Sequence, residues 1–307
     1  MTTDTADTAD VNRLATPPTF QSVSLTRRVK NGVATALVTL AFLIAVVPLV
    51  WVLITVIQRG FPQILDAGWW QKSLSGLTQR QKGGGVYHAI YGTLVQSLVC
   101  GVISVPIGLF LGIYLVEYGK RSRLAKTVTF MVDILTGVPS IVAALFIYAL
   151  WVTTLGLHRS AFAVSLALVL LMVPVVVRTT EEMLKIVPDE LREASYALGI
   201  PKWKTIVKIV VPTAMSGILT GIMLALARVM GETAPVLILV GYAPFINYNM
   251  FDGNMASLPL LMTVERNNPT DAGFQRIWGA AITLVLIITL FSLLATLLSR
   301  WLAPKTK

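Results

Sequence analysis

Two ionisable residues four positions apart, Arg228 and Glu232, lie in an otherwise apolar stretch and have side chains suited to binding an oxyanion. An arginine guanidinium donates two parallel hydrogen bonds to a tetrahedral oxyanion, and an unwound stretch around Gly231 and Pro235 would add backbone donors. Phosphate near neutral pH still carries a proton and can donate a hydrogen bond to Glu232, whereas fully ionised sulfate cannot. The alternative is a structural pair on one helical face, in which the two charges neutralise each other.

Other polar residues at the edges of apolar stretches are candidates for the same path, because charges and hydroxyls in hydrocarbon usually face water or a partner. Arg178 either belongs to the path or reaches the lipid head groups. Thr136 and Ser140 flank a helix break, where they either offer hydroxyls to the path or allow close helix packing. Asp133 is expected to be the structural partner of a nearby base or helix end.

Membrane helices must position these residues. The 307-residue chain is 55% hydrophobic and 13% charged, with a mean hydropathy of +0.74, unlike a soluble domain. Its apolar segments approach or exceed the roughly 20 residues that cross hydrocarbon, where only helices satisfy the backbone. They lie at 33–57, 88–116, 128–152, 161–177, 206–240 and 277–301. We therefore predict an all-α polytopic membrane protein with six transmembrane helices, some of them kinked by proline or glycine.

The basic residues predict the orientation. Of the lysines and arginines, 17 lie in the N-terminal tail, the second and fourth connections and the C-terminal end, and 7 lie in the other connections. Both termini are therefore expected in the cytoplasm. Residues 1–30 lack the apolar core of a signal peptide and are predicted to be a disordered cytoplasmic tail, followed by one membrane domain at 31–307.

The formal net charge of +10 does not indicate a nucleic-acid partner, because the basic residues lie between apolar segments and not on one polar, aromatic-interleaved surface. The single cysteine, Cys100, excludes a disulfide framework within the chain. His88 and His158 have no second histidine or carboxylate at ligand spacing, so we predict no metal site.

The segment at 179–205, between the fourth and fifth apolar stretches, is predicted to form short cytoplasmic helices. Asp189 and Glu190 suit a first helical turn, and Gly199 suits a helix end. One helical face carries small and apolar residues that can seat in a groove, namely Leu191, Ala194, Ser195 and Leu198. Because the chain has no G-x-x-x-x-G-K-[ST] sequence, active transport would require energy from a separate ATPase.

This segment resembles the coupling motif of ABC-importer permeases, which reads E-A-A, three residues, G, nine residues, I, any residue, L-P. The spacing is kept, while Ser195 replaces the second alanine and Val211 replaces the leucine. The matching residues are Glu193, Ala194, Gly199, Ile209 and Pro212. The resemblance implies a type I ABC importer permease fold that docks onto an ATP-hydrolysing subunit through Glu193, Ala194, Ser195 and Gly199.

Further segments resemble the phosphate importer permeases, the PstA type more than the PstC type: GGGVYHAIYGTL, TGVPSIV, PVVVRTTEEML, LREASYALG and ARVMGETAPVL. The resemblance implies a multi-pass prokaryotic cell-membrane protein in which Arg178, Arg228 and Glu232 act in phosphate passage. It also implies a PstC-like second permease, a PstB-like ATPase dimer and an extracytoplasmic PstS-like phosphate-binding protein. ATP and magnesium would be used by the ATPase, with no cofactor on this chain.

Three alternatives remain at this point. The chain could serve an ABC importer of another oxyanion or solute. It could be an ion-coupled secondary transporter or channel, which leaves the coupling segment unexplained. It could be an intramembrane enzyme, although no H-E-x-x-H, paired intramembrane aspartates or G-x-S-x-G sequence is present.

Overall fold

The structure is a computed structural model that describes residues 24–119 and 122–302. Two units are distinguished, residues 1–54 and 55–307. The first contains most of helix α1 (Leu25–Ile64), whose large apolar side chains are mostly exposed, as suits a lipid-facing helix. Of the tail predicted at 1–30, residues 1–23 lie outside the described part and residues 25–30 are helical, as the start of α1.

The described part of the chain is all-helical, as predicted. Within it, five helical stretches are long and apolar enough to cross a membrane, and a bent pair of helices makes a sixth candidate. The first is α1. The others are α3 (Tyr87–Ile113) with its π-helical end η1 (Tyr114–Tyr118), α6 (Ala161–Ile186), the run of α8 (Lys202–Thr205), η3 (Ile206–Val210) and α9 (Val211–Met230), and α12 (Asp271–Leu302).

The third predicted span is a bent pair and not one helix. Helix α4 (Arg123–Gly137) is followed by α5 (Ser140–Ile147) and the π-helical η2 (Tyr148–Thr154), with a bend of 107° at the break. Val138 and Pro139 are extended at this break, because proline disfavours a helical residue before it and cannot donate a helical hydrogen bond.

The fourth span is longer than predicted, since α6 continues without interruption to Ile186. Residues 179–186, expected in the coupling segment, are therefore part of this helix. Helix α7 (Asp189–Ala197) follows after Pro188, with Asp189 and Glu190 in its first turn. Gly199, just beyond α7, has a φ of +73°, a left-handed conformation that glycine adopts without steric penalty.

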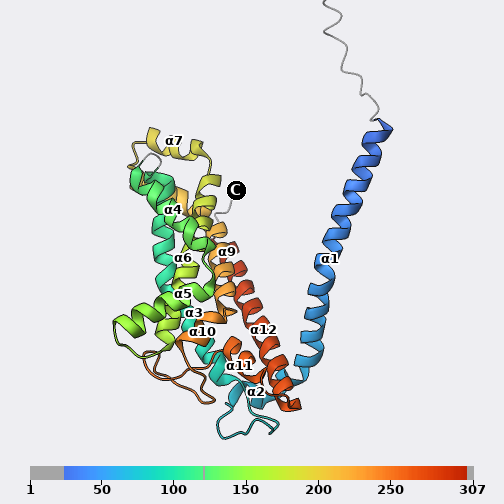
Figure 1. The fold of residues 1–307 in the computed structure, drawn as a ribbon. Helices are drawn as coiled ribbons and strands as arrows, with labels where there is room; N and C mark the ends of the chain where they lie inside the picture. Colours follow the sequence, from blue (N-terminus) through green and yellow to red (C-terminus); the bar gives the residue numbers. More distant parts are fainter. Residues whose placement is uncertain (1–23, 120–121, 303–307) are drawn as a thin grey trace, which may run out of the picture. The chain divides into compact units, whose positions relative to one another are not determined.

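Helix α6 lies in the centre of the second unit and packs against α3 on one side and α9 on another (Figure 1). Glycines allow this close approach. Gly108 of α3 lies against Val176, and Gly221 of α9 lies against Thr179. The main buried apolar cluster is built chiefly from α6 and α9.

The short helices mark the two ends of this unit. Helix α7 lies at one end, named here the α7 end (Figure 1). Helices α2 (Ala67–Gln71) and α11 (Leu258–Glu265) lie at the opposite end, named the α11 end. Helix α10 (Ala234–Leu239) packs against α5 and α6. The side chain of Trp69 in α2 is buried and donates from its indole nitrogen to Thr283 of α12, at 2.9 Å.

Gly92 of α3 provides a test of this packing, because a methyl group there would overlap the backbone carbonyl oxygen of Ala256. We expect Gly92→Ala to lower the free energy of unfolding by about 1–3 kcal/mol, the usual cost of overpacking. Thermal melting of the purified importer complex measures this. Gly137→Ala is the matched control, since a methyl group there meets no atom within 4 Å. Equal melting temperatures for the two variants would contradict the packing described.

Candidate functional site

Arg228 and Glu232 are close in space, but they are not on one continuous helix. Helix α9 ends at Met230, so Arg228 lies in its last turn and Glu232 lies in the break before α10. The Nε atom of Arg228 is 4.0 Å from Oε1 of Glu232. The Arg228 side chain is 65% exposed and the Glu232 side chain 18%. The two residues form a loose ion pair across a helix end.

The break predicted around Gly231 and Pro235 is present, so the apolar segment at 206–240 is not one continuous helix. Gly231 caps α9, and Pro235 begins the next short helix, where a proline fits without breaking a hydrogen bond. The backbone N–H groups of Gly231 and Glu232 donate to Arg228 O and Val229 O, each at 3.1 Å. These two N–H groups are thus occupied and do not supply the extra anion donors that the sequence suggested.

A small polar cavity lies beside Glu232, between α3, α6, α9 and α11. Its polar lining includes Glu232, Gln96 and Ser257. Gln96 is 2% exposed, and its Nε2 has no hydrogen-bond partner in the structure. A buried unpaired amide costs about 1–3 kcal/mol. Sequence inspection missed Gln96, although a glutamine inside an apolar stretch of a membrane helix is itself a signal.

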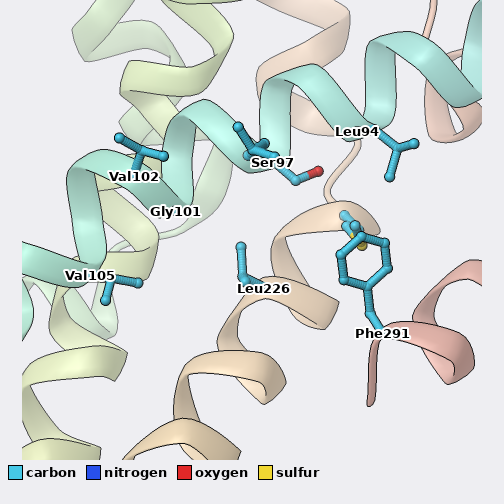
Figure 2. A pocket seen from close by; sticks show the side chains of 9 residues that line it. Leu94, Ser97, Gly101, Val102, Val105, Leu226 and Phe291 are labelled. Atoms are coloured by element: carbon cyan, nitrogen blue, oxygen red, sulfur yellow. The ribbon is translucent and has the colours of Figure 1, made fainter. Parts of the chain in front are cut away.

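An apolar pocket of about 380 Å³ adjoins this cavity, since Ser97 and Met230 line both. Figure 2 shows Leu226 of α9 and Phe291 of α12 projecting towards α3 across it. The Glu232 region is thus bordered by a hydrocarbon-like surface, which disfavours an unpaired charge there.

Arg178 belongs to a different cluster. Its guanidinium pairs with Asp133 of α4 and, at 2.8 Å, with Glu181, which also binds Lys185 at 2.6 Å. Asp133 is the partner of a nearby base, as predicted. Thr179 lies against Gly221, so Arg228 is seven residues, or about 10 Å, further along α9. The structure therefore does not bring Arg178 to Arg228.

Thr136 and Ser140 lie at the bend between α4 and α5. The Thr136 hydroxyl donates to its own helix, at Val132 O, 2.8 Å away. Among the described residues, no hydrogen bond or ion pair joins Thr136 or Ser140 to Arg178, Arg228 or Glu232. Their hydroxyls remain candidates for the path by prediction only.

Helix α7 is anchored by Arg192, a residue that the sequence reasoning treated only as a cytoplasmic charge. Arg192 is buried and binds Oε1 of the buried Glu117 through two nitrogens, at 3.0 and 3.1 Å. It also donates to Leu184 O at 3.0 Å and Val187 O at 2.7 Å, and it pairs with Asp189 at 3.1 Å. The guanidinium thus joins the end of α3, the end of α6 and the start of α7.

The exposed face of α7 differs from the predicted one at Ser195. Its side chain is buried, and its hydroxyl lies 2.8 Å from that of Thr205 in α8. Ser195 therefore holds α7 to α8 and does not lie on the outer face. The other residues predicted for the outer face or for docking are exposed, namely Leu191, Glu193, Ala194, Leu198 and Gly199.

A second buried ion pair organises the α11 end. Glu265 of α11 binds Arg276 of α12 at 3.1 Å, and Arg276 also donates to Gln81 O at 2.7 Å. The side-chain amide of Asn268 donates to both Glu265 and Gln79 O. The connection between α2 and α3 is therefore tied to α11 and α12. Burial, followed by the nearby Glu265 carboxylate, raises the pKa of Tyr242, which keeps this phenol protonated.

These features define an inner-membrane permease of the ABC-importer class. The family described as "Binding-protein-dependent transport system inner membrane component" matches residues 104–307. A solved bacterial alginate ABC transporter covers 92% of this chain and 99% of its own with a TM-score of 0.62 and 14% identity. The MetNI methionine ABC transporter covers 71% and 94% with a TM-score of 0.57 and 20% identity. These two similarities show the fold.

Curated relatives specify the family. The phosphate transport system permease protein PstA 1 of Mycobacterium tuberculosis H37Rv is 58% identical over 282 residues, covering 92% of this chain and 91% of the relative. PstA of Mycobacterium leprae is 60% identical over 269 residues, covering 88% of each. The chain belongs to the PstA family of phosphate transport system permeases. It is a multi-pass inner-membrane subunit of a bacterial phosphate ABC transporter and is not itself catalytic.

The anchor of α7 generates a prediction. Glu117→Ala leaves the buried Arg192 without its main carboxylate partner, and breaking a buried ion pair in this way costs about 3–5 kcal/mol. We expect a large loss of thermal stability of the purified complex. Asp189→Ala removes the exposed partner of the same arginine, and its expected effect is below about 1 kcal/mol. A melting temperature for Glu117→Ala as high as that of Asp189→Ala would show that the anchor is unimportant.

Proposed function

We propose that Arg228 and Glu232 form the phosphate-binding pair of this permease on the translocation path. The observation that carries the proposal is the looseness of their ion pair. The closest contacts in the three other arginine clusters, around Arg178, Arg192 and Arg276, are 3.1 Å or less, whereas Arg228 is 4.0 Å from Glu232. The Arg228 guanidinium therefore retains donors with which to bind an oxyanion.

The exposure of Arg228 supports a second permease beside it. A guanidinium that is 65% exposed on a membrane helix would face hydrocarbon if this chain were alone, at a cost of several kcal/mol. A PstC-like partner that packs beside this surface would replace lipid with protein and enclose a polar path. Phosphate in that path would accept hydrogen bonds from the Arg228 guanidinium and donate a hydrogen bond from its remaining O–H to Glu232.

Arg178 has a less direct role in this proposal. Its guanidinium is shared between Asp133 of α4 and Glu181 of α6, so release of phosphate towards the α7 end would require competition with these carboxylates. Thr136 and Ser140 lie at the break of the same α4–α5 unit, where their hydroxyls would meet the substrate only after a rearrangement.

We propose that the partner ATPase binds α7 and moves it during ATP hydrolysis. Glu193, Ala194 and Leu198 are exposed there, and Arg192 ties the same helix to α3 and α6. A PstB-like ATPase dimer that uses ATP and magnesium would bind this surface. A PstS-like phosphate-binding protein would dock at the opposite, α11 end. There the ion pair of Glu265 and Arg276, with the hydrogen bond from Arg276 to Gln81 O, holds the connection between α2 and α3 in place.

Arg228→Ala tests the substrate site. Removing the guanidinium deletes the two charge-assisted hydrogen bonds to phosphate, so the rate of ATP-dependent phosphate uptake should fall at least about tenfold. Uptake is measured in proteoliposomes that contain the complete importer. The control is Arg28→Ala, which removes an exposed arginine in the first turn of α1 and should leave uptake unchanged. Normal uptake by Arg228→Ala would refute the proposed site.

Leu198→Glu tests the ATPase-docking surface. Leu198 is 79% exposed, and a carboxylate there would be buried without a partner when the ATPase binds. We expect the affinity for the ATPase to fall at least about tenfold, measured by titration of the ATPase onto the reconstituted permeases. Leu198→Met keeps an apolar side chain of similar size and should bind normally. Unchanged affinity for Leu198→Glu would place the docking surface elsewhere.

A further inference from the structure

The polar cavity beside Glu232 contains one buried group that the proposed phosphate pair does not explain, the side-chain amide of Gln96. The cavity has a volume of about 10 Å³, close to the minimum that holds a single water molecule. Leu168, Val236 and Pro259 supply apolar walls. The polar groups around such a small space must therefore satisfy one another, either directly or through one water molecule.

The hydroxyl groups that line the cavity already have partners within the protein. Thr93 donates to Ala89 O and accepts from the backbone N–H of Leu258, each at 2.9 Å. Ser97 donates to Thr93 O. The Ser257 hydroxyl accepts from Leu260 N at 3.4 Å, as the cap of α11.

Gln96 and Glu232 differ from these hydroxyl groups. Gln96 Nε2 is a donor without an acceptor, although the residue is 98% buried. Glu232 is an acceptor whose only ion-pair contact among the described residues is the 4.0 Å approach of Arg228. A donor and an acceptor that both lack good partners line the same cavity, from α3 and from the break after α9. The missing partner of Gln96 Nε2 is an observation that does not involve Arg228.

We propose that Gln96 is a positioning residue for Glu232, whose carboxylate it holds by a hydrogen bond from Nε2 through one buried water molecule. The inference rests on the proposed role of Glu232 in phosphate passage. When phosphate binds the Arg228 guanidinium, the weak ion pair is lost. Gln96 then keeps the Glu232 carboxylate in place to accept the remaining proton of phosphate as a hydrogen bond.

The placement of Gln96 on α3 adds a mechanical consequence. The last turn of the same continuous helical stretch, Tyr87–Tyr118, carries Glu117, which binds Arg192 of α7. Movement of α7 by the ATPase would therefore be passed along α3 to Gln96, and from Gln96 to the acceptor of the substrate pair.

The test is a double-mutant cycle between Gln96→Met and Glu232→Gln in the complete importer in proteoliposomes. Methionine preserves the unbranched shape of glutamine and removes the donor. We measure the rate of phosphate uptake and the phosphate transported per ATP hydrolysed. We expect Gln96→Met to lower the uptake rate about tenfold, which is about 1.4 kcal/mol, with a matching fall in phosphate per ATP. In the Glu232→Gln background, Gln96→Met should have no further effect.

Each alternative outcome has a distinct meaning. Ser104→Ala is the control for loss of a buried polar side chain on α3 away from the cavity, and it should leave phosphate per ATP unchanged. If Gln96→Met lowers uptake and ATP hydrolysis equally, or if its effect adds to that of Glu232→Gln, Gln96 is structural and the inference is overturned. If Glu232→Gln itself transports phosphate normally, the proposed function of Glu232 fails first. If Glu232→Gln impairs transport and Gln96→Met does not, only the inference fails.

Discussion

The cost of burying an ionised side chain without a partner determines how this permease is built. Each buried arginine in the second unit is matched by a carboxylate from another part of the chain. Arg192 joins α7 to Glu117 after α3, and Arg276 joins α12 to Glu265 of α11. Such pairs contribute less to net stability than to fixing which elements meet, because breaking one leaves an uncompensated buried charge. Against this background, the long and exposed pair of Arg228 and Glu232 is the exception.

Helix α3 and its continuation η1 connect the regions proposed to carry the function. Gly108 and Gly112 of α3 pack against α6, Glu117 of η1 binds Arg192 of α7, and the first half of α3 carries Gln96 beside Glu232. Close packing transmits a displacement from one element to its neighbours. The proposed coupling surface and the proposed phosphate-binding pair are therefore both linked to one continuous helical stretch, Tyr87–Tyr118.

The sequence predicts the parts of the fold that depend on local composition. The apolar segments identify the membrane helices, and the helix signals at Asp189, Glu190 and Gly199 place α7 correctly. The kinks at Pro139 and Gly231 were also visible as breaks. The size of the bend at Pro139 could not be predicted, because an angle of 107° depends on how α5 packs against α6 and α10, which hydrophobic periodicity does not encode. Likewise, α6 continues past Pro174 and through residues 179–186, and it ends just before Pro188.

The candidate site was predictable only in part. Arg228 and Glu232 stand out as charges in an apolar stretch, and the structure brings them together. Asp133 pairs with Arg178 and Glu117 pairs with Arg192 from distant positions in the chain, and a single sequence contains no signal for which residues meet in such pairs. Ser195 shows the same limit, since its hydrogen bond to Thr205 turns it away from the outer face of α7.

The most direct test of the central claim is an experimental structure of the assembled importer trapped with phosphate in the membrane path. The account predicts phosphate oxygens about 2.7–2.9 Å from the Arg228 guanidinium nitrogens, with Glu232 in contact with the protonated oxygen. Phosphate bound elsewhere in the path, with Arg228 and Glu232 still paired to each other, would contradict it.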